Sequence, residues 1–182
     1  MSFIADHQRK FTDLGYQIDN LDQLRRQANG GNSILFGYPP DEENLYLAKA
    51  TEALGDRADF IDVSRLLVSF IDDMGWESFE RYYREFGATP HKVFRAGGDD
   101  PDFFNSIIAA IVASAEAGKI PVLIRTGCLV GTGIENANIM DCKEVMRLKV
   151  PLVIFYPSVI VDENLLFLNF KLASKYRCTL VY

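Results

Sequence analysis

Short, mostly apolar runs that alternate with longer amphipathic segments constrain this chain more than any other feature of its sequence. These runs occupy residues 33–36, 58–63, 120–126, 152–156 and 178–182. Strands that are apolar on both sides are typical of parallel sheets, because helices cover both sheet faces. The pattern therefore predicts an α/β domain, a three-layer sandwich around a mostly parallel sheet of about five strands.

The first 30 residues predict a short helical segment that precedes the sheet. Apolar side chains recur there at helical intervals up to Leu14, and Gly15 is expected to end that helix. Asn20 is expected to cap a second helix. Residues 31–182 then hold the sheet and its helices, so that residues 1–182 form a single domain.

The segments between the apolar runs carry the spacing of helices. Helices are expected over residues 41–54, 64–74, 76–86, 102–117 and 134–148. Ser64 is expected to cap the second of these, and Asp100 with Pro101 to begin the fourth, which is apolar nearly all round and should be well buried. Residues 87–101 are otherwise expected to form a loop, and residues 165–172 fit a helix and a strand equally.

The charge of the chain excludes some classes of function. Its 19 basic and 25 acidic residues give a formal net charge of −6, and residues 1–102 hold 19 of the acids against 11 bases. A dedicated nucleic-acid binder carries a basic stripe, so no direct nucleic-acid partner is expected. The acidic half suits either solubility or a basic partner.

The composition predicts no metal site and no membrane span. Three cysteines stand at long spacings, and both histidines lie far from them in sequence. No stretch of about 18 uninterrupted apolar residues exists, and the first residues lack the apolar core of a secretion signal. We therefore expect a cytoplasmic protein with free thiols and without a cofactor.

Loops at the strand ends are the candidate binding sites, because ligands of open α/β sheets lie beyond the carboxyl ends of the strands. The loop 37–43 has two prolines and three acids, which oppose phosphate binding, so ATP is not expected there. The loop after the third strand is rich in glycine. Its candidate ligand-binding or partner-binding residues are Arg125, Thr126, Gly127, Gly131 and Gly133. The same glycines also fit a loop that only needs positive φ angles.

The end of the fourth strand supplies two further candidates, Tyr156 and Pro157. Because proline cannot donate to a ladder, this strand is expected to stop at Pro157. Ser158 follows without the GxSxG elbow of a serine hydrolase. Cys128 lies in the glycine-rich loop, but no base can be assigned to it. The sequence therefore predicts no catalytic residues.

Aromatic residues of the helix over 76–86 form a candidate partner face. Trp76 and Tyr82 are the candidates, since Trp and Tyr dominate binding hot spots. The alternative is that Trp76, Phe79 and Tyr83 pack inward and only Tyr82 is exposed. His7, on the first helix, is expected to be exposed or locally bonded.

The last third of the chain carries a series of segments in a characteristic order. An apolar strand is followed by Thr126-Gly127 and the glycine-rich loop, then by segments 150–157 (VPLVIFYP), 165–168 (LLFL) and 175–177 (KYR). This order resembles the BrxB family of bacteriophage-exclusion (BREX) defence systems, with its TGVG turn, PVVLFYPG strand, LRLF-like segment and NYYRAF ending. The strand at 34–38 and the Pro-Asp-Glu after it also resemble that family. Ser158 replaces the glycine of the family's strand.

The resemblance implies a divergent family member, a small non-catalytic adaptor in antiviral defence and phage resistance. Its expected partners are a PglZ-like protein of the alkaline-phosphatase superfamily and the other components of the defence system. Two alternatives stay open. One is a small-molecule or nucleotide-binding α/β enzyme that uses the glycine-rich loop 126–133, and the other is a nucleotide-binding domain that has lost its phosphate chemistry.

Overall fold

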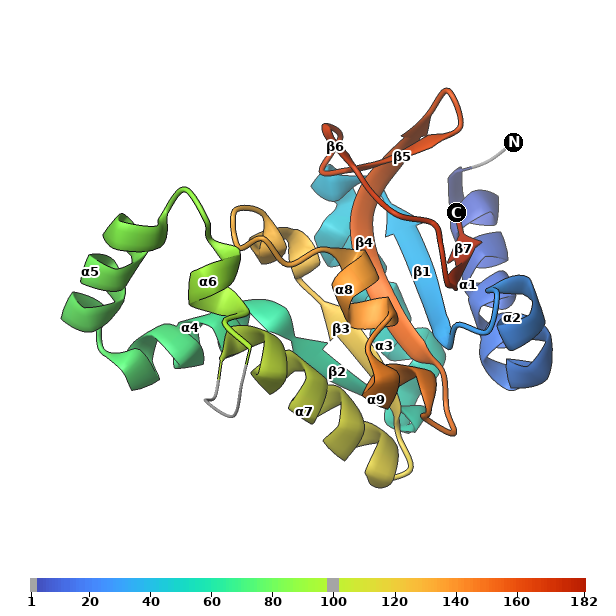
Figure 1. The fold of residues 1–182 in the computed structure, drawn as a ribbon. Coiled ribbons are helices and arrows are strands. Elements are labelled where there is room, and N and C mark those ends of the chain that lie inside the picture. Colours follow the sequence, from blue (N-terminus) through green and yellow to red (C-terminus); the bar gives the residue numbers. More distant parts are fainter. Residues whose placement is uncertain (1–2, 98–101) are drawn as a thin grey trace.

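The computed structural model describes residues 3–97 and 102–182, which form an α/β fold around one mixed sheet (Figure 1). Five strands lie in the order β2-β3-β4-β1-β7, and all their pairings are parallel. Their bounds are β1 (Ser33–Tyr38), β2 (Ala58–Asp62), β3 (Ile120–Ile124), β4 (Leu152–Val161) and β7 (Cys178–Val181). This part of the sheet matches the expected parallel strands.

Two further strands make the sheet mixed and seven-stranded. β5 (Asn164–Phe167) pairs antiparallel with the second half of β4, and β6 (Lys171–Leu172) pairs antiparallel with β5. The expected sheet of about five strands is therefore only partly matched. The segment 165–172, open between helix and strand in the sequence, contributes strands.

Helices connect the parallel strands and cover both faces of the sheet. They are α1 (Phe3–Asp19), α2 (Leu21–Gln27), α3 (Glu43–Leu54), α4 (Val63–Met74), α5 (Trp76–Phe86), α6 (His91–Phe94), α7 (Phe103–Glu116), α8 (Asn136–Met140) and α9 (Lys143–Met146), with 3₁₀ turns η1 (Pro40–Glu42), η2 (Gly55–Arg57) and η3 (Thr126–Leu129). Figure 1 shows α1 and α2 beside the edge strand β7, and α4, α5 and α6 set to the other side of the sheet. Among the described residues, no helix is long and apolar enough to cross a membrane.

The two faces of the sheet carry separate cores, because side chains alternate along each strand. Ile34 and Phe36 of β1 pack in one buried cluster with residues of α1, α2 and α3. Leu35 of β1 packs in the other cluster, with residues of α4 to α9. Every residue of β1 is buried, as the apolar run predicts.

The N-terminal helix runs past its expected end. α1 continues through Gly15, because Leu14 and Ile18 on its inner face are both buried in the core. Asn20 stands at the start of α2, but its side-chain amide donates to the carbonyl of Tyr16 and does not cap the helix.

Two helices differ from expectation between residues 87 and 117. α6 lies inside the expected loop 87–101. Asp100 and Pro101, the expected helix start, lie outside the described residues, and Asp102 caps α7 by accepting the N–H of Asn105. α7 also leaves one face exposed, so its expected burial on nearly all sides is wrong. The exposed residues include Asn105, Ala109, Ala113 and Glu116.

The segment 134–148 is not one amphipathic helix. The backbone of Cys142 is extended, which separates α8 from α9. Met140 and Val145 are both fully buried. Five residues of a continuous helix turn through about 140°, so the break is what lets both side chains reach the core.

β4 continues through Pro157, so the expected strand end is wrong. Pairing with β3 ends at Ile154 and pairing with β5 begins at Ser158. Pro157 lies between these two ladders, where its missing N–H leaves no hydrogen bond unmade. Its carbonyl accepts the N–H of Leu168.

Candidate functional site

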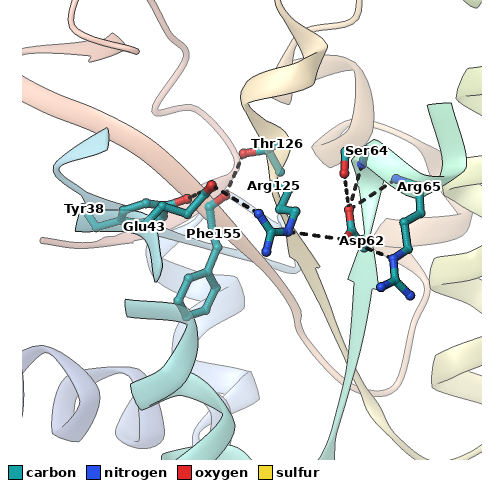
Figure 2. A network of polar contacts seen from close by, with 8 residues as sticks. All are labelled: Tyr38, Glu43, Asp62, Ser64, Arg65, Arg125, Thr126 and Phe155. Atoms are coloured by element: carbon teal, nitrogen blue, oxygen red, sulfur yellow. Dashed lines mark hydrogen bonds and ion pairs between the residues drawn. The ribbon is translucent and has the colours of Figure 1, made fainter. Parts of the chain in front are cut away.

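The carboxyl ends of three parallel strands bring polar and charged side chains together (Figure 2). Tyr38 ends β1, Asp62 ends β2, and Arg125 directly follows β3. Glu43 joins them from the first turn of α3. We call these four residues the edge cluster. Arg125 is the one member that the sequence predicted as a binding residue.

Arg125 stands at the centre of the edge cluster in a strained backbone conformation. Its φ angle of 55° is left-handed, which costs a residue with a side chain about 1 kcal/mol or more. Its Nη1 lies 3.9 Å from Oε2 of Glu43, and its Nε lies 3.4 Å from Oδ2 of Asp62. The side chain is 44% exposed, so each ion pair contributes less than about 1 kcal/mol.

Asp62 contacts both Arg125 and the first turn of α4, the helix that follows it. Its Oδ1 accepts the backbone N–H groups of Ser64 at 3.0 Å and of Arg65 at 3.3 Å, and the Ser64 hydroxyl at 2.6 Å. Asp62 is therefore the N-cap of α4, and the expectation that Ser64 caps this helix is wrong. The side chain is 17% exposed, and it links the end of β2 to the loop after β3.

Tyr38 holds the other carboxylate of the edge cluster. Its hydroxyl donates to Oε1 of Glu43 at 2.8 Å. Burial and the charge of Glu43 raise the pKa of Tyr38, so the phenol stays protonated and remains a donor. The contacts run without a break from Tyr38 through Glu43 and Arg125 to Asp62.

Thr126 and Gly127, two of the predicted loop residues, pack against the chain itself. Thr126 is fully buried, and its hydroxyl donates to the carbonyl of Phe155 on β4 at 2.7 Å (Figure 2). A Cβ added at Gly127 would lie 3.8 Å from Leu168. The Thr126 hydrogen bond holds the loop against β4, and the backbone of Gly127 lies near Leu168, which directly follows β5.

Gly131 and Gly133 supply turns. Both have positive φ angles, 81° and 74°. A Cβ at Gly133 would lie 2.9 Å from the backbone nitrogen of His91. The glycine-rich loop therefore needs both glycines for its own conformation, as the alternative interpretation of the sequence states, and needs Gly133 also for its close approach to α6.

Cys128 lies half-buried in the same loop. Burial raises its pKa to about 11, and the charges of Asp62 and Glu43 add to the effect. The thiolate is the reactive form of cysteine. Cys128 is therefore a neutral thiol at physiological pH and a weak nucleophile.

A second polar group lies at the end of β1 on the side of α1. Nε2 of the buried His7 lies 3.5 Å from Oε2 of Glu42, and its ring packs edge-on against Tyr46. Nζ of the buried Lys10 donates to a carbonyl of β1 and lies 4.7 Å from the ring centre of Tyr182. The expectation of an exposed or locally bonded His7 is wrong, because Glu42 and Tyr46 are distant in sequence.

Tyr156 and Pro157 do not join the edge cluster. Tyr156 stacks on Phe167, with ring centres 4.3 Å apart, and belongs to the core on the face of the sheet opposite Phe155. Burial raises the pKa of Tyr156, which leaves a neutral core side chain. Pro157 continues β4.

The two predicted partner residues on α5 differ in exposure. Trp76 is 64% exposed, while Phe79 beneath it is buried. Tyr82 is half-buried, and its hydroxyl donates to the carbonyl of Lys92. Tyr83 is 40% exposed. The alternative with Tyr82 as the exposed member is therefore wrong, and Trp76 is the most exposed aromatic side chain of α5.

Sequence reasoning missed Glu43 and Asp62 as members of a site. Each was read only as part of an acidic helix start or of a strand. The signal available was an aspartate at the last position of a strand, two residues before a serine that begins a helix. Within residues 3–97 and 102–182, no three His, Cys, Asp or Glu side chains form a group that could hold a metal ion.

Comparisons of the chain with protein-family models, with curated proteins and with solved structures give no match.

Proposed function

We propose that the protein is a non-catalytic adaptor of a bacterial phage-defence complex of the BREX type. It acts in the cytoplasm by binding a PglZ-like partner of the alkaline-phosphatase superfamily. The proposal joins the resemblance to the BrxB family with the chemistry of the sheet edge, where an α/β enzyme would place its reactive groups.

The observation that carries the proposal is the state of the reactive groups at this edge. The Cys128 thiol has a pKa of about 11, so it is protonated at neutral pH. The hydroxyls of Thr126 and Ser158 both donate to backbone carbonyls. A nucleophile needs a neighbouring base or a lowered pKa, whereas these groups stabilise the fold.

The segments that carry the resemblance also lie together. β3 pairs with β4, and β4 pairs with β5, so the three strands with these segments are neighbours in the sheet. A partner would then meet surfaces outside this unit. The exposed Trp76 on α5 offers such a surface, because a large aromatic side chain gains most from burial in a complex.

Co-expression with the PglZ-like protein tests the adaptor function. The wild-type chain should elute with the partner in size-exclusion chromatography, and deletion of its gene should abolish phage restriction. Trp76→Ala should weaken the complex, while Tyr16→Ala, which removes a 51% exposed aromatic from α1, should leave it intact. Absence of a complex, together with restriction that survives the deletion, would contradict the proposal.

A second candidate is a small-molecule or nucleotide site at the glycine-rich loop 126–133. The left-handed φ of Arg125 favours it, since strained residues cluster at functional sites. A ligand at about 100 times its Kd would stabilise the protein by about 2.7 kcal/mol, which a thermal-shift assay detects. Arg125→Gly should relieve the strain and abolish that response. No shift with any nucleotide would exclude this class of ligand.

A further inference from the structure

A groove of about 320 Å³ lies between α4 and the start of α7. Leu66, Ser69, Phe70, Asp73 and Met74 line it from α4, and Asp102 lines it from the N-cap of α7. The α4 residues stand at helical positions i, i+3, i+4, i+7 and i+8, so they form one face of the helix. Its apolar lining comes from Leu66, Phe70 and Met74, and a carboxylate lies on each side.

The carboxylate on α4 is left uncompensated by the chain. Asp73 and its neighbour Asp72 are exposed, and no hydrogen bond or ion pair within the described part of the chain engages either carboxylate. Both lie in the last turn of α4, which has no basic residue. The C-terminal end of a helix carries a partial negative charge, so acids there destabilise the helix.

The carboxylate on α7 lies at the opposite wall, where it serves as the N-cap of that helix. Asp102 is only 5% exposed, and its two oxygens accept the N–H groups of Asn105 and Gly97. The N-terminal end of α7 compensates this charge, so Asp102 forms part of the wall and attracts a cation only weakly. Among the described residues, the charged side chains that line the groove are acidic. Asp73 is the exposed one without a partner in the described part of the chain, so the complementary ligand is cationic.

We propose that this groove binds an amphipathic helix of a partner protein, with apolar side chains in the groove and Lys or Arg side chains against Asp73. Binding of a helix in an apolar groove is a common mode of peptide recognition, and Met and Phe linings adapt to different side chains. The identity of that partner as the PglZ-like protein rests on the proposed function. The apolar and basic side chains expected of the bound helix follow from the lining of the groove alone.

Two matched substitutions separate binding from helix stability. Asp73→Asn and Glu116→Gln each remove a negative charge from the exposed last turn of a helix, α4 and α7 respectively. Both should therefore raise the Tm by about 1–3 °C. Only Asp73 lines the groove, so only Asp73→Asn should weaken the helix complex.

The probe is a fluorescein-labelled peptide of about 14 residues, with Leu and Lys placed to form an amphipathic helix. Its control carries Glu in place of every Lys. By fluorescence anisotropy at low salt, the Leu/Lys peptide should bind the wild-type chain, and Asp73→Asn should raise its Kd about fivefold. Glu116→Gln should change the Kd less than about twofold, and the difference should fade at high salt.

Equal binding of the Leu/Glu peptide, or equal effects of the two substitutions, would overturn the inference. The same variants are then tested in the complex with the PglZ-like protein. If the complex forms and Asp73→Asn leaves it unchanged, the groove inference fails while the adaptor proposal stands. If no complex forms but the peptide discriminates, the adaptor proposal fails and the groove inference stands. A wild-type dimer that Asp73→Asn dissociates would make a second copy the occupant and overturn the partner helix.

Discussion

Asp62 offers a direct test of the edge cluster, because its one carboxylate caps α4 and faces Arg125. Asp62→Ala removes both roles. Asp62→Asn removes the charge but keeps the cap, since asparagine caps helices about as well as aspartate. The pair of variants therefore separates the contribution of the helix cap from that of the ion pair.

The structure sets the size of each effect. Loss of an N-cap costs about 1 kcal/mol, and the Ser64 hydroxyl, 2.6 Å from Oδ1, loses its acceptor at a further cost of about 0.5–1 kcal/mol. The Arg125 side chain is 44% exposed, so its pair with Asp62 adds only about 0.5 kcal/mol. Asp62→Ala should thus lose about 2 kcal/mol and Asp62→Asn about 0.5 kcal/mol.

Thermal unfolding followed by circular dichroism measures the difference. For a chain of this size 1 kcal/mol shifts the Tm by about 2–4 °C, so Asp62→Ala should lower it by about 4–8 °C and Asp62→Asn by about 1–2 °C. The effect of the negative charge of Asp62 can be measured separately, because this charge helps to raise the pKa of Cys128. Asp62→Asn should speed alkylation of Cys128 at a fixed alkaline pH. Equal destabilisation by the two variants would refute the assignment of the cap as the larger contribution.

Four further predictions test packing and titration. Gly31→Ala should lower the free energy of unfolding in urea by about 1–3 kcal/mol, because its Cβ would lie 2.1 Å from the backbone oxygen of Arg177. Gly15→Ala, whose Cβ meets nothing within 4 Å inside α1, should raise it by about 0.5–1 kcal/mol. Burial raises the pKa of Cys178 from 9.0 to about 12, so the native state holds this proton more tightly than the unfolded state. Stability should be complete below about pH 9 and fall toward pH 12, and urea titrations should show a smaller fall for Cys178→Ala. Cys128, with its pKa of about 11, should react with iodoacetamide almost tenfold faster for each pH unit up to that value, whereas a rate that levels off near pH 8 would contradict the raised pKa.

The central parallel strands β1, β3 and β4 were predictable because their apolar runs report burial on both sides. In β1, Leu35 and Phe36 face opposite cores, and both are fully buried. A strand with one solvated face would have shown alternation instead. The apolar run of β1 therefore predicts that helices cover both of its faces.

The antiparallel extension was not predictable from turn signals. Its two tight turns place Asp162-Glu163 and Leu168-Asn169 at positive φ. The first is a two-residue hairpin, which usually carries Asn-Gly or Asp-Gly, and the second is a three-residue loop, which usually carries glycine at its left-handed position, because glycine adopts these angles without strain. Without that signal, the segment after Pro157 gave no reason to continue β4.

One member of the edge cluster, Arg125, was predictable. Arg125 follows a buried strand, and this position alone marks it as a candidate. Glu43 and Asp62 stand at helix starts, where acids are common because the helix dipole favours them. Which of these acids meets a cation depends on pairing between strands that are distant in sequence. Tyr156 was predicted as a site residue, but it is a core residue. Successive side chains of β4 point to opposite faces of the sheet, so Tyr156 packs on the face opposite Phe155.

α4 carries acids at both ends, and their positions have opposite consequences. Asp62 at the N-terminal end meets two backbone N–H groups and the side chain of Arg125, so the fold itself compensates this charge. Asp73 in the last turn meets the negative end of the same helix, and no described residue compensates it. A cationic partner gains little at the first site, where it must displace Arg125, but at the second it relieves a cost that the free protein already bears. This difference is why we place the binding of a basic helix in the groove between α4 and α7 and not at the sheet edge.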